Sequence, residues 1–480
     1  MLRILLILLA SVCLRAEDDL EQTVRKIFGV LQVMEEHGAD AVNSERAFYG
    51  GIIPGMLRRL DPHSAFMDAE QFAQLKRMQR SESKGFGSVV SILPGRVIVL
   101  QTIAGTPMQR SGISAGDEIV AINNIALGPL TPEQLVQVLS EARQGPALVH
   151  VRKPGNARPL QFTLTPQEMQ APSVERAFLL EAGVGYLRVA SFDESTARDM
   201  KDAVEKLGGS KLKGLVLDLR NNPGGAVASA LDAASLFLQP GQVILSARGR
   251  RVSAEEKVSP ISTPYAFPMS VIVTAKTASA AEILAGALQD HDRATIVGEP
   301  TFGKGLVQNV MPLREGTALA LTTAFYYTPS GRSIQKPLEG MQLEHSTLKP
   351  AQVYKTGKGR EVRGGGGIEP DQSVQPLATK RLEQFLEASG AYTVFATEFL
   401  RGKPVIPPKF EPPPDMIDKF RAYLSQNRVQ PGIGEWFASA DWIRFRLRQE
   451  IVNQSLGVEK GDEIEAEREP YIQTALAALR

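Results

Sequence analysis

The chain has 480 residues, which is too long for one hydrophobic core and predicts about three domains. With 43% hydrophobic and 22% charged residues, its composition is that of an ordinary soluble globular protein. The formal net charge of +1 argues against a nucleic-acid partner and against attachment through a polybasic membrane surface.

The N-terminus is typical of a secretory signal peptide, which we expect to span residues 1–16. Arg3 supplies the charged start, 4–10 the apolar run and Ala16 a small residue for cleavage. The apolar run is too short to cross a bilayer, and the alternative is a buried N-terminal helix. The signal predicts a periplasmic or secreted protein.

Cys13 is the only cysteine, and it lies inside this leader. Cleavage after Ala16 would leave a mature chain without cysteine, which suits an oxidising compartment and rules out disulfides and zinc–thiolate sites. A lipid anchor on Cys13 is the less favoured interpretation because Val12 fits that signal poorly. We expect no metal and no cofactor.

The rest of the chain divides by its residue patterns into four regions. Residues 17–81 are expected to be helical, with breaks at Gly50-Gly51 and Asp61-Pro62. Residues 82–167 form a small β-rich domain, 168–375 an α/β core with a loop over about 337–367, and 376–480 a second helical region. Trp442, Phe445 and Ile451 indicate an amphipathic helix in the last region.

In two of these regions the pattern predicts where individual strands and helices begin and end. In the β-rich domain we expect strands at 88–92, 96–101, 118–122 and 147–152 and a helix at 132–142. In the core we expect strands at 184–192, 215–219, 269–274, 294–297 and 305–312 and helices at 226–238 and 280–290. The continuously apolar run 215–219 predicts a strand covered on both faces.

The most informative feature is a serine at a strand-to-helix junction together with a lysine between two glycines. Ser279 stands between Ala278 and Ala280, where backbone N–H groups of a helix start could stabilise an oxyanion. Lys304 stands between Gly303 and Gly305, and a lysine in a dry pocket can lose its proton and act as a general base. Together they indicate a serine hydrolase that uses lysine instead of histidine.

Two further groups support this interpretation. Gly224 and Gly225 follow a buried strand and could present a second N–H to the serine. Gln308 lies four residues after Lys304, so in a strand both side chains point to one face and the amide could orient the amine. Taken singly, Ser279 is more simply a helix N-cap, Lys304 a solvated turn residue and the glycines a helix start.

A histidine-based triad and a phosphate-binding loop are the rival interpretations. His291 is the one histidine near Ser279 in sequence, but it lies past the far end of the same predicted helix. The run from Gly298 to Lys304 has the spacing of a phosphate loop, yet Gly305 stands where that loop needs Ser or Thr. Neither rival is favoured.

The β-rich domain contains the run Gly85-Phe86-Gly87 before its first strand. A glycine loop at a strand edge can receive a peptide carboxylate in its N–H groups while the peptide adds a strand. The alternative is an ordinary turn.

These runs resemble the carboxyl-terminal processing proteases, also called tail-specific proteases, over about residues 17–375. Gly-Phe-Gly and the run from Gly112 to Asn123 are similar to the family's PDZ domain. The signatures of its protease domain are matched by Asp-Leu-Arg-Asn-Asn-Pro-Gly-Gly (218–225), Thr-Ala-Ser-Ala-Ala-Glu-Ile-Leu-Ala-Gly (277–286), Phe-Gly-Lys-Gly-Leu-Val-Gln (302–308) and Gly-Arg-Ser-Ile-Gln (331–335). The chain departs from the family at Ala281, where a serine is common, and in the long segment 337–367.

The resemblance implies an ATP-independent endopeptidase with an α/β core like that of ClpP and crotonase relatives, an inserted PDZ domain and flanking helical regions. It implies Ser279 as nucleophile, Lys304 as general base, Gln308 as its orienter, and the N–H groups of Gly225 and Ala280 as the oxyanion site. Substrates would be proteins or peptides with free C-termini, held at Gly85, Phe86 and Gly87. A homo-oligomer through the terminal helical regions and an adaptor protein are further expectations. The alternatives are a catalytically idle PDZ scaffold and a non-peptide acyl hydrolase.

Overall fold

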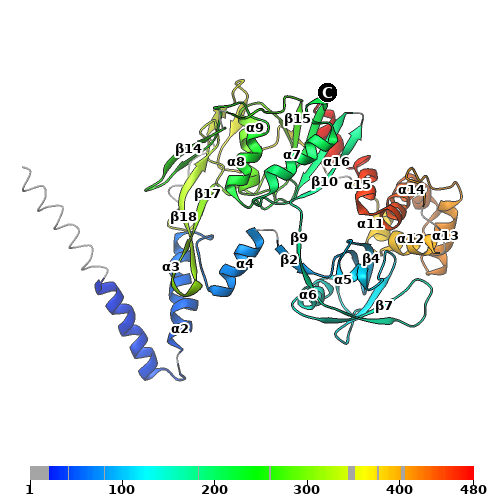
Figure 1. Cartoon of the computed structure of the whole chain (residues 1–480), viewed down its shortest axis with the longest axis horizontal. Coiled ribbons are helices and arrows are strands. Elements are labelled where there is room, and N and C mark those ends of the chain that lie inside the picture. The colour runs from blue at the N-terminus through cyan, green and yellow to red at the C-terminus, as the bar shows by residue number, and fades with distance from the viewer. Residues whose placement is uncertain are drawn as a thin grey trace, which may run out of the picture. The chain divides into compact units, whose positions relative to one another are not determined.

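The computed structural model describes residues 21–41, 43–79, 82–181, 183–258, 261–343, 352–375, 378–401 and 406–480 (Figure 1). The predicted signal peptide, including Cys13, lies outside these residues. The chain forms two compact parts, which we describe separately. Of the described residues, the N-terminal part comprises those up to Phe72 with 307–323 and those of 337–348, and the main part comprises the remainder.

The N-terminal part is built from helices and a short sheet. Residues 21–37 are helical and are followed by α2 (Ser44–Ala47), the π-helical turn η1 (Phe48–Ile52) and α3 (Ile53–Leu60). Strand β1 (Ala65–Met67) pairs antiparallel with the start of β18 (Ala318–Tyr327), and β17 (Leu306–Pro312) pairs with β18 as well. Helix α4 (Ala69–Gln79) begins in this part and leads into the main part.

The break predicted at Gly50-Gly51 is wrong. Both glycines lie inside η1, and the residues flanking this turn, Ala47 and Ile53, have right-handed helical dihedrals, so the helix continues from α2 to α3. A π-turn absorbs the extra residue without ending the helix. Tyr49 stacks on Phe66 at 5.2 Å between ring centroids, a tertiary contact that offsets the low helix propensity of glycine. The break at Asp61-Pro62 is confirmed, since α3 ends at Leu60.

The β-rich domain has the predicted strands at nearly the predicted bounds. Its sheet has the order β3-β4-β5-β7-β8, with β6 paired to β5. The strands are β3 (Ser88–Leu93), β4 (Arg96–Thr102), β5 (Glu118–Ile122), β6 (Ile125–Ala126), β7 (Ala147–Arg152) and β8 (Leu160–Leu164). Helices α5 (Pro107–Arg110) and α6 (Pro132–Ala142) accompany it. At its entry and exit, β2 (Glu82–Gly85) pairs antiparallel with β9 (Gln167–Gln170), so a two-stranded ribbon joins this domain to the core.

The α/β core is a six-stranded sheet of order β10-β11-β12-β15-β16-β21, in which all pairs except β10–β11 are parallel. Every residue of β12 and of β15 is buried, which confirms that these strands are covered on both faces. The strands are β10 (Val174–Glu181), β11 (Val184–Val189), β12 (Gly214–Asp218), β15 (Met269–Val273), β16 (Thr295–Gly298) and β21 (Gln372–Ser373). Helices α7 (Thr196–Leu207), α8 (Val227–Ser235) and α9 (Ala280–Asp290) accompany this sheet in Figure 1.

A second sheet of the main part contains β13 (Val243–Arg248) and β14 (Ser253–Lys257), with β13 also pairing with the end of β18. The segment 337–367, predicted as a loop, contains a strand pair that the sequence did not reveal. Here β19 (Val353–Lys355) pairs with β20 (Glu361–Arg363). Arg360 beside this hairpin contacts the carboxylates of Asp292 and Asp371, which holds the hairpin near the end of α9.

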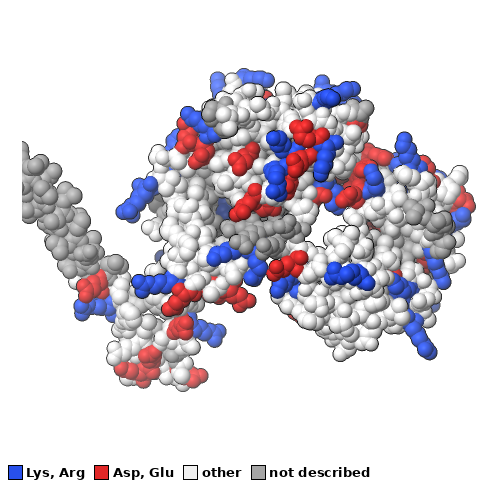
Figure 2. Space-filling model, viewed as in Figure 1, with Lys and Arg blue, Asp and Glu red and all other residues white. Residues whose placement is uncertain are grey.

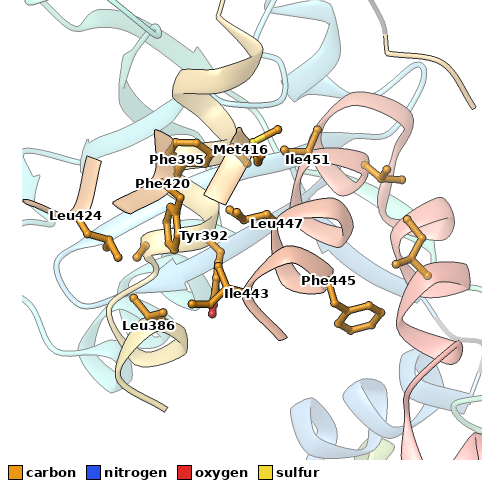
Figure 3. Close-up of a cluster of buried hydrophobic side chains, with 14 of the residues drawn as sticks. Leu386, Tyr392, Phe395, Met416, Phe420, Leu424, Ile443, Phe445, Leu447 and Ile451 are labelled. Carbon is orange, nitrogen blue, oxygen red and sulfur yellow. The ribbon is translucent and has the colours of Figure 1, made fainter. Parts of the chain in front are cut away.

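The C-terminal region is helical, as predicted, and most of it forms one cluster. Its helices are α11 (Arg381–Ala388), α12 (Ala391–Leu400), α13 (Met416–Gln426), α14 (Ile433–Leu456) and α15 (Val458–Ala466). Figure 3 shows the buried side chains of this cluster, among them Phe395, Phe420, Leu447 and Ile451, converging from several helices. Helix α16 (Pro470–Ala477) is different because it packs on the core sheet, with Ile472 among the core residues.

The charged surface is mixed. On the face drawn in Figure 2, basic and acidic side chains alternate without a large field of one sign. Among the helices of the described ranges, none combines the length and the apolar character that a bilayer-crossing segment needs.

Candidate active site

Ser279 occupies a strained junction between a strand and a helix. Strand β15 ends at Val273 and α9 begins at Ala280, so the serine is the residue immediately before the helix. Its backbone has φ 55° and ψ −118°, a region that residues with a Cβ rarely occupy. Ser279 is the N-cap residue of α9, as the alternative interpretation expected, and Glu282 forms a capping box with it. The strained backbone is therefore held by the structure around it.

Two glycines approach this junction more closely than any side chain would allow. A Cβ on Gly224 would lie 2.9 Å from the backbone nitrogen of Ala280, and one on Gly225 would lie 2.0 Å from the carbonyl oxygen of Phe192. Phe192 pairs with this turn through the N–H of Ala226 and the carbonyl of Gly224. In a parallel bridge the N–H of the middle residue, Gly225, is directed away from that partner.

The turn is fixed by Asn222, whose side chain is fully buried. Its amide nitrogen donates to the carbonyl of Val189 at 2.8 Å, its amide oxygen accepts from the N–H of Gly224 at 2.8 Å, and its carbonyl accepts from the N–H of Ala278 at 2.9 Å. The glycine turn and the residue before Ser279 are thus both tied to Asn222, the first through its side chain and the second through its backbone carbonyl. The predicted oxyanion residues Gly225 and Ala280 belong to these two joined segments.

Asp218, at the end of β12, anchors the start of the same loop. This fully buried carboxylate accepts from Arg220 at 2.6 Å and from the hydroxyl of Tyr186 at 2.6 Å. Arg220 also contacts Glu469 at 2.9 Å, beside α16. Burial raises the pKa of Tyr186, and the negative charge of Asp218 raises it further, so the hydroxyl keeps its proton and remains a donor. The final helix thereby contributes to holding the loop.

Glu282 connects the serine junction to the lysine loop. Its carboxylate is fully buried and accepts four hydrogen bonds. The donors are the N–H of Ser279 (2.8 Å), the N–H of Gly303 (2.8 Å), the N–H of Lys304 (2.9 Å) and the hydroxyl of Thr301 (2.5 Å). Burial raises the pKa of Glu282, whereas these donors oppose that rise by stabilising the carboxylate.

The hydrogen bonds of Glu282 fix the relative positions of the serine junction and the lysine loop. One rigid side chain fixes the backbone of the candidate nucleophile and the backbone of the candidate base, so neither segment can move without breaking bonds to the other. The position of Glu282, three residues after Ser279, is the acidic position of a capping-box pattern. That spacing is the signal that could have revealed its role from the sequence.

Tyr326, in β18, makes a second connection between the same two segments. Its hydroxyl lies 2.6 Å from the carbonyl oxygen of Lys304 and 3.2 Å from that of Ser279. The side chain is buried, and burial, with the nearby Glu282, raises its pKa well above the usual value. The phenol is consequently a neutral donor throughout the range in which enzymes are assayed. No motif in the sequence indicates this residue.

Lys304 is partly buried between Gly303 and Gly305. The segment that follows it is strand β17, not a helix, which excludes the phosphate-loop interpretation because that loop opens a helix. The histidine alternative also fails. His291 lies beyond the end of α9, where Nε2 contacts the carbonyl of Val243 at 2.7 Å and Nδ1 contacts Gln242 at 3.2 Å.

Gln308 lies in β17 and belongs to the N-terminal part, whereas Ser279, Lys304, Gly225 and Ala280 belong to the main part. Within its own part, the amide nitrogen of Gln308 donates to the carbonyl of His63 at 2.7 Å. The amide therefore has a defined orientation.

In the β-rich domain, Gly85, Phe86 and Gly87 lead from β2 into β3, which is an edge strand of the sheet. The carbonyl of Phe86 accepts from Met108 at 2.9 Å, and that of Gly87 accepts from Ile103 at 2.9 Å. The carbonyls are thus turned into the domain. Gly87 has φ 81°, and a Cβ there would lie 2.2 Å from Thr106, so only glycine fits this position.

No group of three or more His, Cys, Asp or Glu side chains in the described ranges is arranged to hold a metal ion.

Comparison with known proteins assigns the family. The model of peptidase family S41 matches residues 183–343, and that of the PDZ domain matches 74–152. A carboxyl-terminal-processing protease of Synechocystis is 33% identical over 291 residues, which are 59% of this chain and 68% of that protein. This chain belongs to peptidase family S41, the carboxyl-terminal processing proteases.

A second curated relative and a solved structure are also similar to this chain. The carboxy-terminal-processing protease of Bartonella bacilliformis is 38% identical over 291 residues, covering 59% of this chain and 66% of that protein. A solved structure of the photosystem II D1 C-terminal processing protease is 26% identical, covers 75% of this chain and 89% of that one, and has a TM-score of 0.41. The matches to the two bacterial proteases span about two thirds of their length.

Membership of the S41 family makes the chain a serine endopeptidase with a PDZ domain. The predicted fold class, an α/β protease core with an inserted PDZ domain and flanking helices, is confirmed. The matched S41 segment contains Ser279, Lys304 and Gln308.

Proposed function

We propose that this S41 peptidase is an ATP-independent endopeptidase that cleaves proteins presented by their C-termini, with Ser279 as nucleophile and Lys304 as general base. The observation that carries the proposal is the shared carboxylate of Glu282, which accepts from the N–H groups of both residues at 2.8 and 2.9 Å. A nucleophile and a base whose backbones are fixed to one side chain are preorganised for proton transfer.

The chemistry follows from these groups. Ser279 Oγ attacks the scissile carbonyl carbon, and its proton passes to the neutral amine of Lys304. The oxyanion that develops accepts from the N–H groups of Gly225 and Ala280. The lysine ammonium then returns the proton to the leaving amine, which gives an acyl-enzyme on Ser279. Water, deprotonated by the same lysine, hydrolyses this ester and regenerates the serine.

Gln308 is proposed to orient the amine of Lys304. The neutral amine of a lysine has two N–H bonds and one lone pair, which rotate together about the Cε–Nζ bond. A fixed amide oxygen that accepts from one N–H selects one rotational arrangement and so directs the lone pair. The orientation of Gln308 by the His63 carbonyl supports this role.

The PDZ domain is proposed to hold the free C-terminus of the substrate at Gly85, Phe86 and Gly87. The carbonyls of Phe86 and Gly87 are engaged inside the domain, and β3 is an edge strand, so a peptide could add to the sheet with its carboxylate at this loop. Amidation of a substrate's C-terminus should then weaken its capture. Equal cleavage of amidated and free peptides would show that this domain does not recognise a carboxylate.

The leader predicted at residues 1–16 supports a periplasmic or secreted location. A homo-oligomer through the terminal helical regions is supported by the helical segment 21–37. Its apolar residues Val24, Phe28, Val30, Val33 and Met34 are 41–62% exposed. An adaptor protein, if one takes part, would deliver substrates to the enzyme.

The decisive experiment compares the wild type with Ser279→Ala in three assays: fluorophosphonate labelling, casein cleavage, and mass spectrometry of C-terminal fragments from secreted proteins. We expect all three to depend on Ser279. A folded wild-type protein that neither labels nor cleaves, and that still binds C-terminal peptides, would instead be an idle PDZ scaffold. Labelling without any peptide cleavage would favour a non-peptide acyl hydrolase.

A further inference from the structure

A buried carboxylate organises the turn that follows α3. Asp61 is fully buried, and its Oδ1 accepts from the N–H groups of His63 and Ser64, both at 2.8 Å. Its Oδ2 accepts from the hydroxyl of Ser64 at 2.6 Å. Pro62 cannot continue the helix, so the chain leaves α3 in one defined conformation. We call residues 61–64 the Asp61 turn.

The Asp61 turn is attached to strand β18. The hydroxyl of Ser64 accepts from the N–H of Thr322 at 3.1 Å, and the next residue, Ala65, pairs with Ala320 in the β1–β18 ladder. The turn thus has a fixed position beside the strand that pairs with β17. The carbonyl of His63 projects from it and accepts from Nε2 of Gln308 at 2.7 Å.

This contact determines which end of the Gln308 amide is the donor toward the turn. A glutamine amide carries donors on one end and an acceptor on the other. When Nε2 is bound to a carbonyl, Oε1 must face the opposite way. The orientation of Gln308 therefore depends on a main-chain carbonyl whose place is set by Asp61 and Ser64.

We propose that the Asp61 turn is a positioning element for the active site: it holds the His63 carbonyl so that Gln308 presents Oε1 for the amine of the lysine base. This inference rests on the proposed function, in which Gln308 orients Lys304. Asp61 and Ser64 are positioning residues, since they act through Gln308. The residues that precede the PDZ domain in sequence would then be required for catalysis and not only for assembly.

The test is a double-mutant cycle between the turn and the glutamine. Asp61→Asn keeps the size of the side chain and one acceptor oxygen, but it puts a donor where the Ser64 hydroxyl needs an acceptor. We expect kcat to fall at least about 10-fold with KM changed less than about 2-fold, because misplacing a positioning group by a fraction of an ångström has effects of this order. In the Gln308→Ala background the same substitution should cause no further fall in kcat.

A matched control is Asp68→Asn. It removes the same charge from the same part, and Asp68 also accepts from a backbone N–H, that of Gln71 at 2.8 Å, but contacts neither His63 nor Gln308. We expect its kcat to equal that of the wild type. Circular dichroism and thermal melts should accompany every variant.

Gln308→Glu tests the inference independently of how well the turn variants fold. Glutamate keeps an oxygen for the amine but places an acceptor against the His63 carbonyl. We expect its kcat to be no higher than that of Gln308→Ala, and a value closer to the wild type would overturn the inference.

The cycle has distinct outcomes for the two levels of the argument. If the losses from Asp61→Asn and Gln308→Ala multiply, or if Asp61→Asn leaves kcat unchanged, the Asp61 turn does not act through Gln308 and this inference is wrong. If Asp61→Asn does not fold, Ser64→Ala takes its place in the same cycle with the same expectation. Casein cleavage retained in Ser279→Ala would overturn the proposed function itself.

Discussion

The hydroxyl of Tyr326 lies 2.6 Å from the backbone carbonyl oxygen of Lys304. The two residues come from the second sheet and from the loop before β17, and the same hydroxyl lies 3.2 Å from the carbonyl of Ser279. A phenol has one proton, so the shorter contact is the donated bond and the longer one shares it weakly. Tyr326 thus fixes the candidate base more firmly than the candidate nucleophile.

Removing this hydroxyl should lower activity more than its effect on stability suggests. We expect Tyr326→Phe to lower the free energy of unfolding by about 0.5–1.5 kcal/mol, the usual net value of one hydrogen bond, and to lower kcat about 10-fold because the lysine loop loses its fixed position. Tyr327→Phe is the control, since Tyr327 contacts the guanidinium of Arg248 through its ring, at 4.8 Å. Equal kcat values for the two variants would contradict the assignment.

Glu282→Gln should damage both segments at once. Of the four donors that meet the carboxylate, at least one would face an amide N–H₂ group and lose its partner. A buried unsatisfied donor costs about 1–3 kcal/mol, so we expect a fall of this size in the free energy of unfolding. We also expect a loss of kcat comparable to that of Lys304→Ala. Urea denaturation and casein cleavage measure the two effects.

The same substitution has a pH signature. Burial raises the pKa of Glu282 in the folded state, so between the unfolded pKa, about 4.3, and the higher folded value the native state binds more protons than the unfolded state. The contribution of this group to wild-type stability should therefore be greatest below that window and fall as pH rises through it. Glu282→Gln lacks this contribution, so the stability difference between the two proteins should shrink with rising pH. A difference that grows would mean that the hydrogen bonds outweigh burial.

Ser279 and Lys304 should behave as one catalytic unit. Ser279→Ala and Lys304→Ala are each expected to remove nearly all casein hydrolysis, and the double variant should be no worse than either, because removing one member already abolishes the shared step. Gln308→Ala should be milder, since it orients the amine without taking the proton. Multiplying losses in the Ser279–Lys304 pair would show that the two residues act independently.

A lysine base also predicts the shape of the pH–rate profile. Only the neutral amine of Lys304 can accept the serine proton, so kcat/KM should rise with pH as that fraction increases. Assays from about pH 6 to 9 on an unstructured substrate, chosen to cover the range around neutrality, measure this limb. A flat profile over the same range would argue against Lys304 as the base.

The sequence revealed the residues whose roles depend on local pattern. Ser279 could be found because a strand, a run of small residues and a helix follow one another there, and the bounds of α9 were predicted correctly. Tyr326 was missed because its partners lie far along the chain, and the capping-box spacing of Glu282 does not reveal its bonds to the loop at 301–304. The continuous helix at Gly50-Gly51 was missed for a similar reason, since the stacking of Tyr49 on Phe66 is a tertiary contact.

The PDZ domain provides the last prediction, because the structure shows where it can be removed. Its ends meet in the ribbon of β2 and β9, where Gly85 pairs with Gln167, so residues 86–166 can be replaced by a short Asn-Gly turn that keeps the ribbon paired. The C-terminal helices also contact the domain, with the side chain of Gln101 accepting from the N–H of Val458 at 3.0 Å. The deletion therefore also frees one contact of those helices.

We expect the deleted protein to cleave unstructured casein at least as fast as the wild type, because Glu282, Asn222 and Tyr326, which hold the candidate catalytic groups of the main part, all lie outside the domain. We also expect it to lose its preference for substrates with a free C-terminus. Gln101→Ala in the full chain, which removes the hydrogen bond from Val458, separates the effect on the C-terminal helices from the loss of the domain. A deleted protein that is folded by circular dichroism but inactive on casein would show that the PDZ domain helps to assemble the site. Unchanged rates on both casein and C-terminally tagged substrates would show that it neither recognises substrate nor restrains the enzyme.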